Sequence, residues 1–350
     1  MYLPDDVIAH VREVSDEPDL SATKYRLLRP LGRGGMAGVY AVEDTELGRE
    51  VALKVSTATT AERCARMQLE AKVIARLEHP GIVPVHDVGQ LPDGRVYYVM
   101  KLVRGERLDR WARRPLERGA RLRTFAQVCR AVAFAHAHGV IHRDLKPENV
   151  MVGPFGEALV MDWGLAKASH ARVGTDAATA TERISGPRVV ESLAGATQDG
   201  TILGTPAYMP PEQARGEIDA LDARADVYAL GAILYFLLAR RAPFEGETPD
   251  AVLERVRDTP PRALRELAPQ LPRALDSICA KAMSRDREAR YAGALELAAD
   301  VDAFLDAQPV SAHREAAWER AARFASRHRV LLSLFGVYLA VRVLLALLAS

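Results

Sequence analysis

The sequence predicts an α+β protein with two lobes, a small strand-rich one followed by a larger helical one. Strand-like patterns dominate up to residue 103, and helical patterns dominate from residue 108 onward. Such a change along the chain is typical of two packed units with a cleft between them. The chain has 350 residues, of which 49% are apolar, so it can bury a sizeable core without the help of disulfides.

About five runs of alternating or apolar residues, bounded by turn residues, indicate strands in the first lobe. These strands are expected at residues 25–30, 38–43, 50–56, 82–88 and 95–103. Between the third and the fourth of them, residues 61–78 place apolar side chains on one side of a helix. Pro80 and Gly81 follow this pattern and predict the end of the helix.

The second lobe is predicted to be mainly helical. Helical patterns cover residues 121–138, 222–239, 249–258, 271–284 and 293–307. Residues 169–200 interrupt them with a stretch rich in alanine, threonine, glycine and serine that has no periodicity. This stretch is too long for an ordinary connection between two elements, so we interpret it as a mobile functional loop.

The composition argues against several classes of protein. The chain has 47 basic and 46 acidic residues, so no overall charge draws it to nucleic acid, and we expect no nucleic-acid partner. The three cysteines are Cys64, Cys129 and Cys279. They are isolated from one another, which indicates a reducing compartment with neither a zinc site nor a disulfide framework.

Residues 1–24 are predicted to be an acidic lead-in to the first lobe. Within residues 1–20 a single arginine, Arg12, stands against six acidic residues, which are Asp5, Asp6, Glu13, Asp16, Glu17 and Asp19. The same stretch lacks the apolar core and the cleavage site of a signal peptide. We interpret the lead-in as solvated or loosely docked, with a docking peptide as the alternative.

A glycine-rich segment at residues 31–40 connects the first two predicted strands. Glycines such as Gly32 and Gly34 allow backbone N–H groups to close over phosphate oxygens without a clash from a Cβ atom. A plain hairpin turn is an equally good interpretation of this segment taken alone. A GxGxxG pattern would have its third glycine at position 37, where this chain has Ala37, and Gly38 follows directly after it.

Lys54 stands at the end of the apolar run 51–54, inside a predicted strand. Burying an unpaired ammonium group is unfavourable, so this lysine needs an anion beside it. Glu70, on the inner side of the following helix, is the candidate. The pair is either a structural salt bridge or an ion pair that holds the lysine on a phosphate group.

Residues 142–149 concentrate polar and charged side chains between apolar flanks, a pattern that does not fit a core strand. Asp144 and Asn149 lie within this run, and Asp162 follows a second apolar run further along the chain. Two acids and an asparagine near one cleft suit magnesium and phosphate, because Mg²⁺ takes oxygen ligands and keeps several waters.

In this order and spacing, the motifs resemble those of the protein kinase superfamily, and specifically of bacterial Ser/Thr kinases of the eukaryotic, or Hanks, type. The matched elements are the glycine-rich segment, VALK at 51–54, Glu70, HRDLKPEN at 142–149, DWG at 162–164, PPE at 210–212, Asp226 and Arg290. The resemblance covers residues 25–305 and implies the bilobal kinase fold. The chain departs from the family pattern at Ala37, Lys101, Trp163 and Pro210, without losing a phosphate, metal or base group.

The resemblance implies a role for each polar group. Lys54 would hold the α- and β-phosphates of ATP and pair with Glu70. Asp144 would accept the proton of the substrate hydroxyl, and Lys146 would neutralise the γ-phosphate as charge shifts. The third catalytic side chain, Asn149, would also act as a metal ligand. The residues expected to hold Mg²⁺, with Mn²⁺ as a second possibility, are Asn149 and Asp162.

The resemblance also implies an adenine pocket at the junction of the lobes. Adenine would lie between Val39 and Ala52 on one side and Met151 on the other. The backbone of residues 101–103 would form the hinge behind the gatekeeper Met100. The complete set of expected nucleotide-binding residues is Gly32, Gly34, Val39, Ala52, Lys54, Glu70, Met100, Lys101, Val103 and Met151.

The function implied is ATP-dependent phosphorylation of protein serine and threonine hydroxyls in bacterial signalling. Lys146, two residues after Asp144, resembles the lysine that Ser/Thr kinases have at this position and tyrosine kinases do not. A pseudokinase that binds nucleotide as a scaffold is the alternative, and the intact polar groups argue against it. A small-molecule phosphotransferase is a third interpretation, against which the peptide-platform segment 204–212 argues.

The segment from 162 to 212 corresponds to the activation segment of the family. Arg143 would pair with a phosphate on this segment and order it. Thr197 is the favoured phosphosite, and the other candidates are Thr175, Thr179, Thr181, Ser185, Ser192 and Thr201. We expect trans-autophosphorylation, which requires two copies of the chain to associate.

Residues 330–349 form a stretch of 20 residues with a single charge, Arg342. Thirteen of them are Leu, Val or Phe. Insertion of these side chains into a bilayer is worth about −5 kcal/mol, against about +3 kcal/mol for the arginine. The stretch therefore predicts a hydrophobic helix that crosses the membrane, with an in-plane helix as the alternative. Basic residues in the preceding segment mark the cytoplasmic side.

The expected organisation follows from these assignments. It comprises an acidic lead-in at 1–24, a kinase domain at 25–307, a basic juxtamembrane segment at 308–329 and a transmembrane helix at 330–349. Within the kinase domain we expect an N-lobe at 25–100, a hinge at 101–103 and a C-lobe at 104–307. The expected location is the bacterial inner membrane, single-pass with the kinase domain in the cytoplasm, or the cytoplasm if the tail does not insert.

Overall fold

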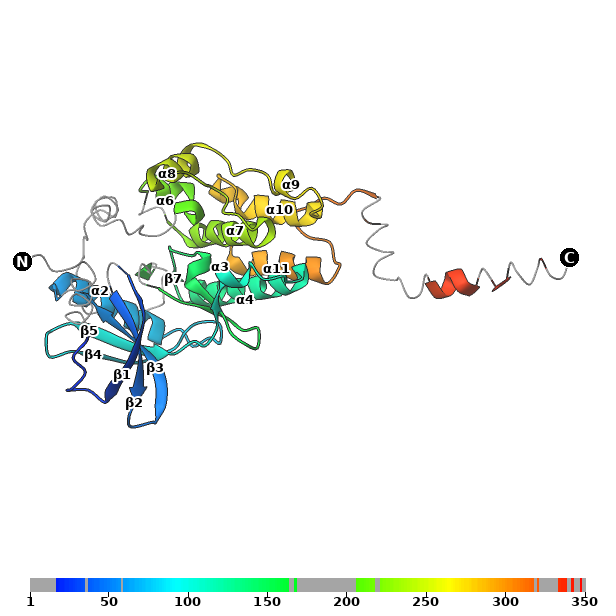
Figure 1. The fold of residues 1–350 in the computed structure, drawn as a ribbon. Helices are drawn as coiled ribbons and strands as arrows, with labels where there is room; N and C mark the ends of the chain where they lie inside the picture. Colours follow the sequence, from blue (N-terminus) through cyan, green and yellow to red (C-terminus); the bar gives the residue numbers. More distant parts are fainter. Residues whose placement is uncertain are drawn as a thin grey trace, which may run out of the picture.

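Two lobes of different secondary structure make up the folded part of the chain (Figure 1). The computed structural model describes residues 17–34, 37–57, 59–163, 167–168, 206–217, 221–317, 320, 333–338, 341–342 and 347. In Figure 1 the strands of the first lobe run from blue to cyan, and the helices of the second run from green to orange. The predicted α+β class and two-lobe division are therefore confirmed.

Five strands form the antiparallel sheet of the first lobe. Their order across the sheet is β1-β2-β3-β5-β4. The strands are β1 (Tyr25–Arg33), β2 (Ala37–Asp44), β3 (Arg49–Ser56), β4 (Val85–Gln90) and β5 (Val96–Lys101). The fourth was predicted to begin at Ile82, which instead bridges to Val160 of the second lobe. Ile82 and Val83 thus join the lobes before the strand begins.

The helix α2 (Ala61–Ala75) covers one face of this sheet, where Met67 and Ala71 pack against Val96 and Tyr98. The opposite, outer face has its own apolar cluster, which includes Leu20, Tyr25, Val42, Leu53, Val55, Tyr97 and Val99. Burial of Leu20 shows that part of the predicted lead-in packs on the protein, while residues 1–16 lie outside the described part of the chain.

The second lobe is built on long helices whose apolar residues form one large core. The helices are α4 (Arg118–Ala137), α7 (Ala223–Ala239), α8 (Pro249–Asp258), α10 (Arg273–Ala282) and α11 (Ala294–Leu305), with short turns α3 (Leu108–Trp111), α6 (Pro211–Ala214) and α9 (Leu264–Leu267). The predicted helix at 222–239 begins one residue later because Asp222 caps it, accepting a hydrogen bond from the Arg224 amide at 2.8 Å. Leu230 and Leu234 on this helix are fully buried.

Short strands support the loop after α4. The helical pattern predicted for the second lobe did not include them. A three-stranded sheet joins β6 (Glu106–Arg107), β8 (Val150–Val152) and β9 (Ala158–Val160). A second pair joins β7 (Val140–Ile141) to β10 (Lys167–Ala168). The polar run 142–149 therefore lies between β7 and β8, with a 3₁₀ turn at Pro147–Asn149. Its side chains are held at the junction of the two lobes.

The end of the second lobe is fixed by one carboxylate. Asp300 accepts hydrogen bonds from the amides of Ser311 and Ala312 at 2.7 and 3.0 Å and from the Tyr291 hydroxyl at 2.7 Å. Further along, residues 333–338 are helical, and Leu334 and Phe335 are each 62% exposed. Within the described residues we find no helix of sufficient length and apolarity to cross a bilayer. Most of the span predicted at 330–349 lies outside those residues, so it stays a prediction.

Candidate active site

Lys54 connects both lobes through two carboxylates. Its Nζ lies 2.9 Å from Glu70 Oε1, on α2, and 2.7 Å from Asp162 Oδ1, just after β9. The Lys54 side chain is only 12% exposed, whereas that of Asp162 is 54% exposed at the edge of the cleft. The predicted partner of the buried lysine is therefore correct, and a second carboxylate joins it.

The surroundings of Lys54 keep it charged. Burial alone would lower its pKa, but the oxygens of Tyr98, Asp162 and Glu70 outweigh burial and raise the pKa well above its usual value. Burial alone would raise the pKa of Asp162, but the nearby Lys54 ammonium outweighs burial and lowers that pKa. The site thus holds an ammonium and an ionised carboxylate side by side at neutral pH.

Tyr98 is a site residue that sequence reasoning missed. Its hydroxyl donates a hydrogen bond of 2.8 Å to Glu70 Oε1, the same oxygen that contacts Lys54. Burial raises the pKa of Tyr98, so the hydroxyl stays protonated and remains a donor. Its position in an apolar strand gives it the pattern of a core residue, and only its cross-strand pairing with Lys54 signals the polar role.

A second polar cluster forms on the loop between β7 and β8. Lys146 Nζ lies 2.8 Å from Asp144 Oδ2. The Asn149 amide nitrogen donates to the Asp144 backbone oxygen at 2.8 Å and to Oδ2 at 3.2 Å. Asp144 is 37% exposed, so a hydroxyl group entering from solvent can reach it. The three predicted catalytic residues are therefore in mutual contact.

The backbone of that loop is clamped by a buried carboxylate from α7. Asp226 accepts hydrogen bonds from the amides of His142 and Arg143 at 2.7 and 2.8 Å, and His136 Nε2 lies 2.8 Å from it. Burial would raise the pKa of Asp226, but the hydrogen bond from His136 and the nearby charges lower it. Arg143 has a φ of 69°, an unfavourable conformation for a non-glycine residue, which this clamp maintains.

Trp163, which replaces the family phenylalanine, fills a core position. It is 1% exposed, and its ring centroid lies 4.6 Å from that of His142. His142 Nε2 donates to the Met161 carbonyl at 3.0 Å. This bond fixes the imidazole ring of His142 beside Trp163. Asp162, directly before Trp163, has a φ of 57°, which lies in the left-handed region. A buried aromatic ring therefore occupies this position.

The residues expected around adenine come from strands of both lobes. Ala52 on β3 is buried, whereas Val39, Met100 and Met151 are half-buried. The Lys101 amide donates to the Pro84 carbonyl at 3.1 Å, which fixes the start of the hinge. Along the glycine-rich segment, the Gly34 amide donates to Ala37 O at 2.9 Å. Residues 35 and 36, at its tip, lie outside the described residues.

The donor set suits a divalent metal and phosphate. Asp162 offers an exposed carboxylate, and Asn149 offers an amide oxygen because its nitrogen is turned toward Asp144. These are hard oxygen ligands of the kind that Mg²⁺ takes, with room left for water and phosphate oxygens. Within the described residues no group of three or more His, Cys, Asp or Glu side chains could hold a metal on its own.

The predicted phosphosites at 175–201 fall outside the described residues, but the end of the same segment is well defined. Glu212 forms a buried pair with Arg290, and Gln213 Nε2 donates to the Arg143 backbone oxygen at 2.9 Å. Glu212 therefore pairs with Arg290 although Pro210 departs from the family pattern. Gln213 joins this segment to the backbone of residues 142–149, a contact that sequence reasoning missed.

Comparison with known proteins identifies extensive similarities. A family profile described as "Protein kinase domain" matches residues 25–300. The chain is 38% identical over 310 residues to the probable serine/threonine-protein kinase SCO3848 of Streptomyces coelicolor, covering 85% of this chain and 42% of that protein. It is 36% identical over 287 residues to the probable serine/threonine-protein kinase PknB of Lactococcus lactis, covering 80% and 42%.

A third relative is the DNA damage-responsive serine/threonine-protein kinase RqkA of Deinococcus radiodurans. It is 40% identical over 266 residues, which cover 74% of this chain and 36% of the relative. The aligned part of this chain thus spans less than half the length of each of these curated relatives. The similarity therefore concerns the two lobes described above.

Proposed function

The chain belongs to the protein kinase family, and on that premise we propose that it is an active ATP-dependent serine/threonine protein kinase of the bacterial Hanks type. The observation that carries the proposal is the complete polar constellation at the junction of the lobes. Lys54 is engaged by Glu70 and Asp162, and Asp144 is engaged by Lys146. A scaffold without activity has no need for both clusters at once.

In the proposed reaction Asp144 accepts the proton of a serine or threonine hydroxyl and orients its oxygen toward the γ-phosphate of ATP. Lys146, 2.8 Å from Asp144, neutralises charge on the transferred group. Lys54 holds the α- and β-phosphates under the glycine-rich segment. The protein thus contributes positioning and fixed charge, with no covalent intermediate.

Mg²⁺ would be held by Asn149 and Asp162 and would supply Lewis-acid neutralisation of the phosphate oxygens. In the structure Asp162 also contacts Lys54, at 2.7 Å. Both side chains are oxygen donors at the cleft, which is what supports their assignment. Mn²⁺ takes similar ligands and would serve as a substitute.

The direct test uses the full chain with Mg²⁺ and γ-labelled ATP, beside Asp144→Asn as a near-isosteric control. We expect label on serine or threonine in the wild type and none in the variant, with equal thermal unfolding temperatures for the two. Retained ATP binding without any label transfer, in the presence of a generic protein substrate, would replace this proposal by the pseudokinase scaffold.

Regulation of the kinase by phosphorylation of its own segment 162–212, in trans between two copies, is part of the proposal. The contact of Gln213 with Arg143 supports it, because Gln213 directly follows this segment and joins its end to the loop that carries Asp144. Mass mapping after incubation with ATP should find phosphate between residues 162 and 212, with Thr197 favoured. Incorporation rates should rise more than linearly with kinase concentration. A strictly linear dependence would indicate reaction within one copy.

Attachment to the bacterial inner membrane through residues 330–349 completes the proposal. The composition of this stretch and the exposed apolar side chains of Leu334 and Phe335 support it. The full chain should float with liposomes and resist extraction by high salt. The matched variant Leu334→Asp combined with Leu344→Asp should stay in the soluble fraction. Extraction of the wild type by salt would indicate an in-plane helix instead.

A further inference from the structure

The start of α4 carries a surplus of positive charge. Residues 110–123 contain six arginines and a single carboxylate, that of Glu117. Arg240, at the end of α7, joins them because its guanidinium group contacts the Arg114 carbonyl. α4 and α7 pack against each other in the helical lobe (Figure 1). The six arginines are Arg110, Arg113, Arg114, Arg118, Arg121 and Arg123.

Arg121 is the buried member of this group, with 8% of its surface exposed. Its Nη2 donates a long hydrogen bond of 3.4 Å to the Arg114 carbonyl, and its Nε has no hydrogen-bond partner within the described residues. Arg240 Nη2 donates to the same carbonyl oxygen, also at 3.4 Å. Two like charges therefore converge on one neutral acceptor.

A third guanidinium group lies on the first turn of α4. A Cβ atom at Gly119 would stand 3.2 Å from Nη1 of Arg123, so this group packs directly over Gly119. Glu117, the N-cap residue, makes no side-chain hydrogen bond to the amides of that turn. Amides at a helix N-terminus carry partial positive charge and favour an anion. The helix end and the guanidinium groups beside it thus lack the same partner.

No carboxylate neutralises these three guanidinium groups. In the part of the chain that the structure describes, no ion pair involves Arg121, Arg123 or Arg240. Burial and the nearby charge of Arg240 both lower the pKa of Arg121. The negative end of the α7 dipole offsets part of the charge of Arg240, which leaves the charges of Arg121 and Arg123 in excess. A bound anion would relieve this repulsion.

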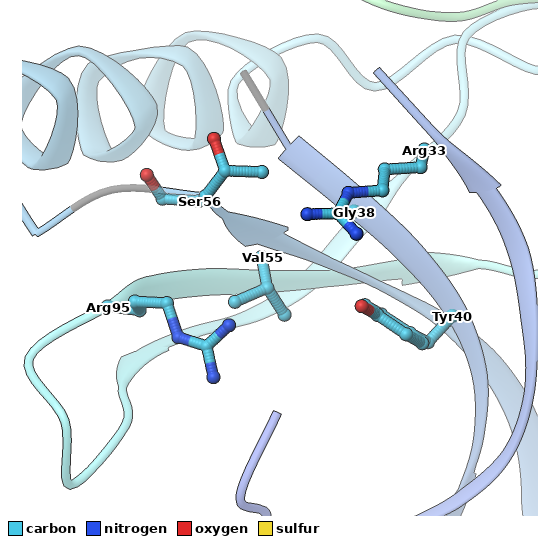
Figure 2. A pocket seen from close by; sticks show the side chains of 7 residues that line it. Arg33, Gly38, Tyr40, Val55, Ser56 and Arg95 are labelled. Carbon is cyan, nitrogen blue, oxygen red and sulfur yellow. The ribbon is translucent and has the colours of Figure 1, made fainter. Parts of the chain in front are cut away.

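Another place where two arginines meet has a different character. Figure 2 shows Arg33 and Arg95 beside a cavity whose free volume is about 10 Å³, the space of one water molecule. Both side chains are engaged within the protein, and Arg95 Nε lies 2.6 Å from Asp93 Oδ2. Closely spaced arginines are therefore no site by themselves. The start of α4 differs because its buried guanidinium group keeps an unpaired nitrogen.

We infer that the start of α4 binds the phosphate group of a phosphorylated serine or threonine in a protein partner, through Arg121, Arg123 and Arg240. Guanidinium groups present paired donors that match the oxygens of a phosphate. A phosphate monoester carries nearly two negative charges at neutral pH, so it balances the surplus better than one carboxylate does. It also projects on a side chain, which suits a recessed group such as Arg121 better than the phosphodiesters of a flat bilayer surface do.

A partner bound there would be held near the proposed catalytic loop. The turn α3, which directly precedes this arginine-rich stretch, packs against the 3₁₀ turn Pro147–Asn149 that follows Asp144. In the proposed kinase, the second contact should lower KM for a phosphorylated protein substrate by roughly tenfold or more and leave kcat unchanged. This kinetic effect rests on the proposed function, whereas phosphate binding itself does not.

The test measures binding by the full chain in neutral detergent, without nucleotide and after its own phosphates have been removed by a phosphatase. The probe is a short fluorescent peptide with one phosphothreonine among glycines and serines. It should bind roughly tenfold or more tightly than the same peptide without phosphate, because each charge-assisted hydrogen bond is worth about 1.4 kcal/mol or more, a factor of ten. Its affinity should fall as the salt concentration rises.

The double variant Arg123→Gln with Arg240→Gln should lose this preference for the phosphorylated peptide. Both side chains are exposed, and removal of like charges should leave the thermal unfolding temperature unchanged or higher, so that lost binding is not a sign of unfolding. The matched control is Arg241→Gln, directly after Arg240 in the chain but paired with Glu245. This control should bind the phosphopeptide as the wild type does.

Equal binding of the two peptides, or unchanged binding by the double variant, would overturn the inference. Inorganic phosphate might be the actual ligand, in which case it would raise the unfolding temperature of the wild type while the phosphopeptide fails to bind, and the inference would again be wrong. Binding of phosphatidylserine vesicles through Arg123 and Arg240, in place of the phosphopeptide, would assign a membrane surface instead. Because no nucleotide is present, a chain that binds the phosphopeptide but transfers no phosphate would refute only the proposed function.

Discussion

Arg290 and Glu212 form a bidentate ion pair inside the helical lobe. Nη1 and Nη2 of Arg290 lie 2.7 and 2.9 Å from the two carboxylate oxygens of Glu212, and both residues are buried. Arg290 also donates from Nε to the Ser284 carbonyl at 2.7 Å. The pair joins the start of α6 to the turn before α11.

Arg290→Ala should reduce the free energy of unfolding by about 3–5 kcal/mol, because it leaves the Glu212 carboxylate buried without a counter-charge. The matched control is Arg241→Ala, which breaks an exposed pair with Glu245 and should change stability by less than about 0.5 kcal/mol. Urea unfolding followed by circular dichroism measures both. Equal effects of the two variants would show that the buried pair has no special role.

Glu70→Gln should weaken ATP binding by roughly tenfold to a hundredfold, because Lys54 loses a charge-assisted hydrogen bond worth about 1.5–3 kcal/mol. Tyr98→Phe removes only the hydroxyl that donates to the same oxygen of Glu70. Its effect should be smaller, in the same direction. Titration with a fluorescent ATP analogue measures both affinities. The order would be contradicted if the Tyr98→Phe variant bound the ATP analogue more weakly than the Glu70→Gln variant.

The low pKa of Asp226 predicts a pH dependence of stability. The unfolded carboxyl has a pKa of about 3.9, and the folded value lies below it. The ionised form therefore stabilises the fold above about pH 4, and this contribution is lost as the pH falls through the folded pKa. Asp226→Asn should be less stable than the wild type at pH 7, with the difference shrinking toward pH 3. Unfolding free energies measured from pH 3 to 7 decide the matter, and a constant difference would exclude the linkage.

The cysteines should differ in reactivity toward maleimide. Cys129 and Cys279 are buried, and burial raises the pKa of both thiols, so little thiolate is present. Cys64 on α2 is partly exposed. In the native protein only Cys64 should be modified within minutes, and all three should react in urea, as peptide mass spectrometry would show. Rapid labelling of Cys129 in the native state would mean that the helical lobe opens readily.

Local patterns predict much of this molecule because they report local physics. The apolar strand around Lys54 and the amphipathic pattern around Glu70 place a lysine and a carboxylate on facing surfaces, and the structure brings them to 2.9 Å. The polar run 142–149 identifies its own loop. By contrast, the clamp of Asp226 on the amides of His142 and Arg143 depends on how α7 packs against that loop, more than eighty residues away along the chain. A local sequence pattern carries no information about a contact between residues so far apart in the chain.

The short strands show a second limit. β7 and β10 have two residues each and are stabilised by pairing, so they carry too few residues for an alternating pattern to appear. Tyr98 illustrates a third limit, since a tyrosine in a buried strand has the same pattern whether its hydroxyl meets solvent or a glutamate. A bond of this kind depends on which helix packs against the strand, here α2 with Glu70.

The placement of Asp226 on α7 has a consequence for how the sequence can vary. The neighbours of Asp226 on that helix, among them Leu230 and Leu234, form the centre of the helical lobe. A repacking there that preserves stability can still rotate the helix and draw the carboxylate away from the two amides that it holds. A tolerated substitution in α7 must therefore meet two requirements. The helical lobe must still fold, and the loop that carries Asp144 must keep its conformation. Among folded variants of this helix, catalytic competence should be rarer than stability alone would suggest.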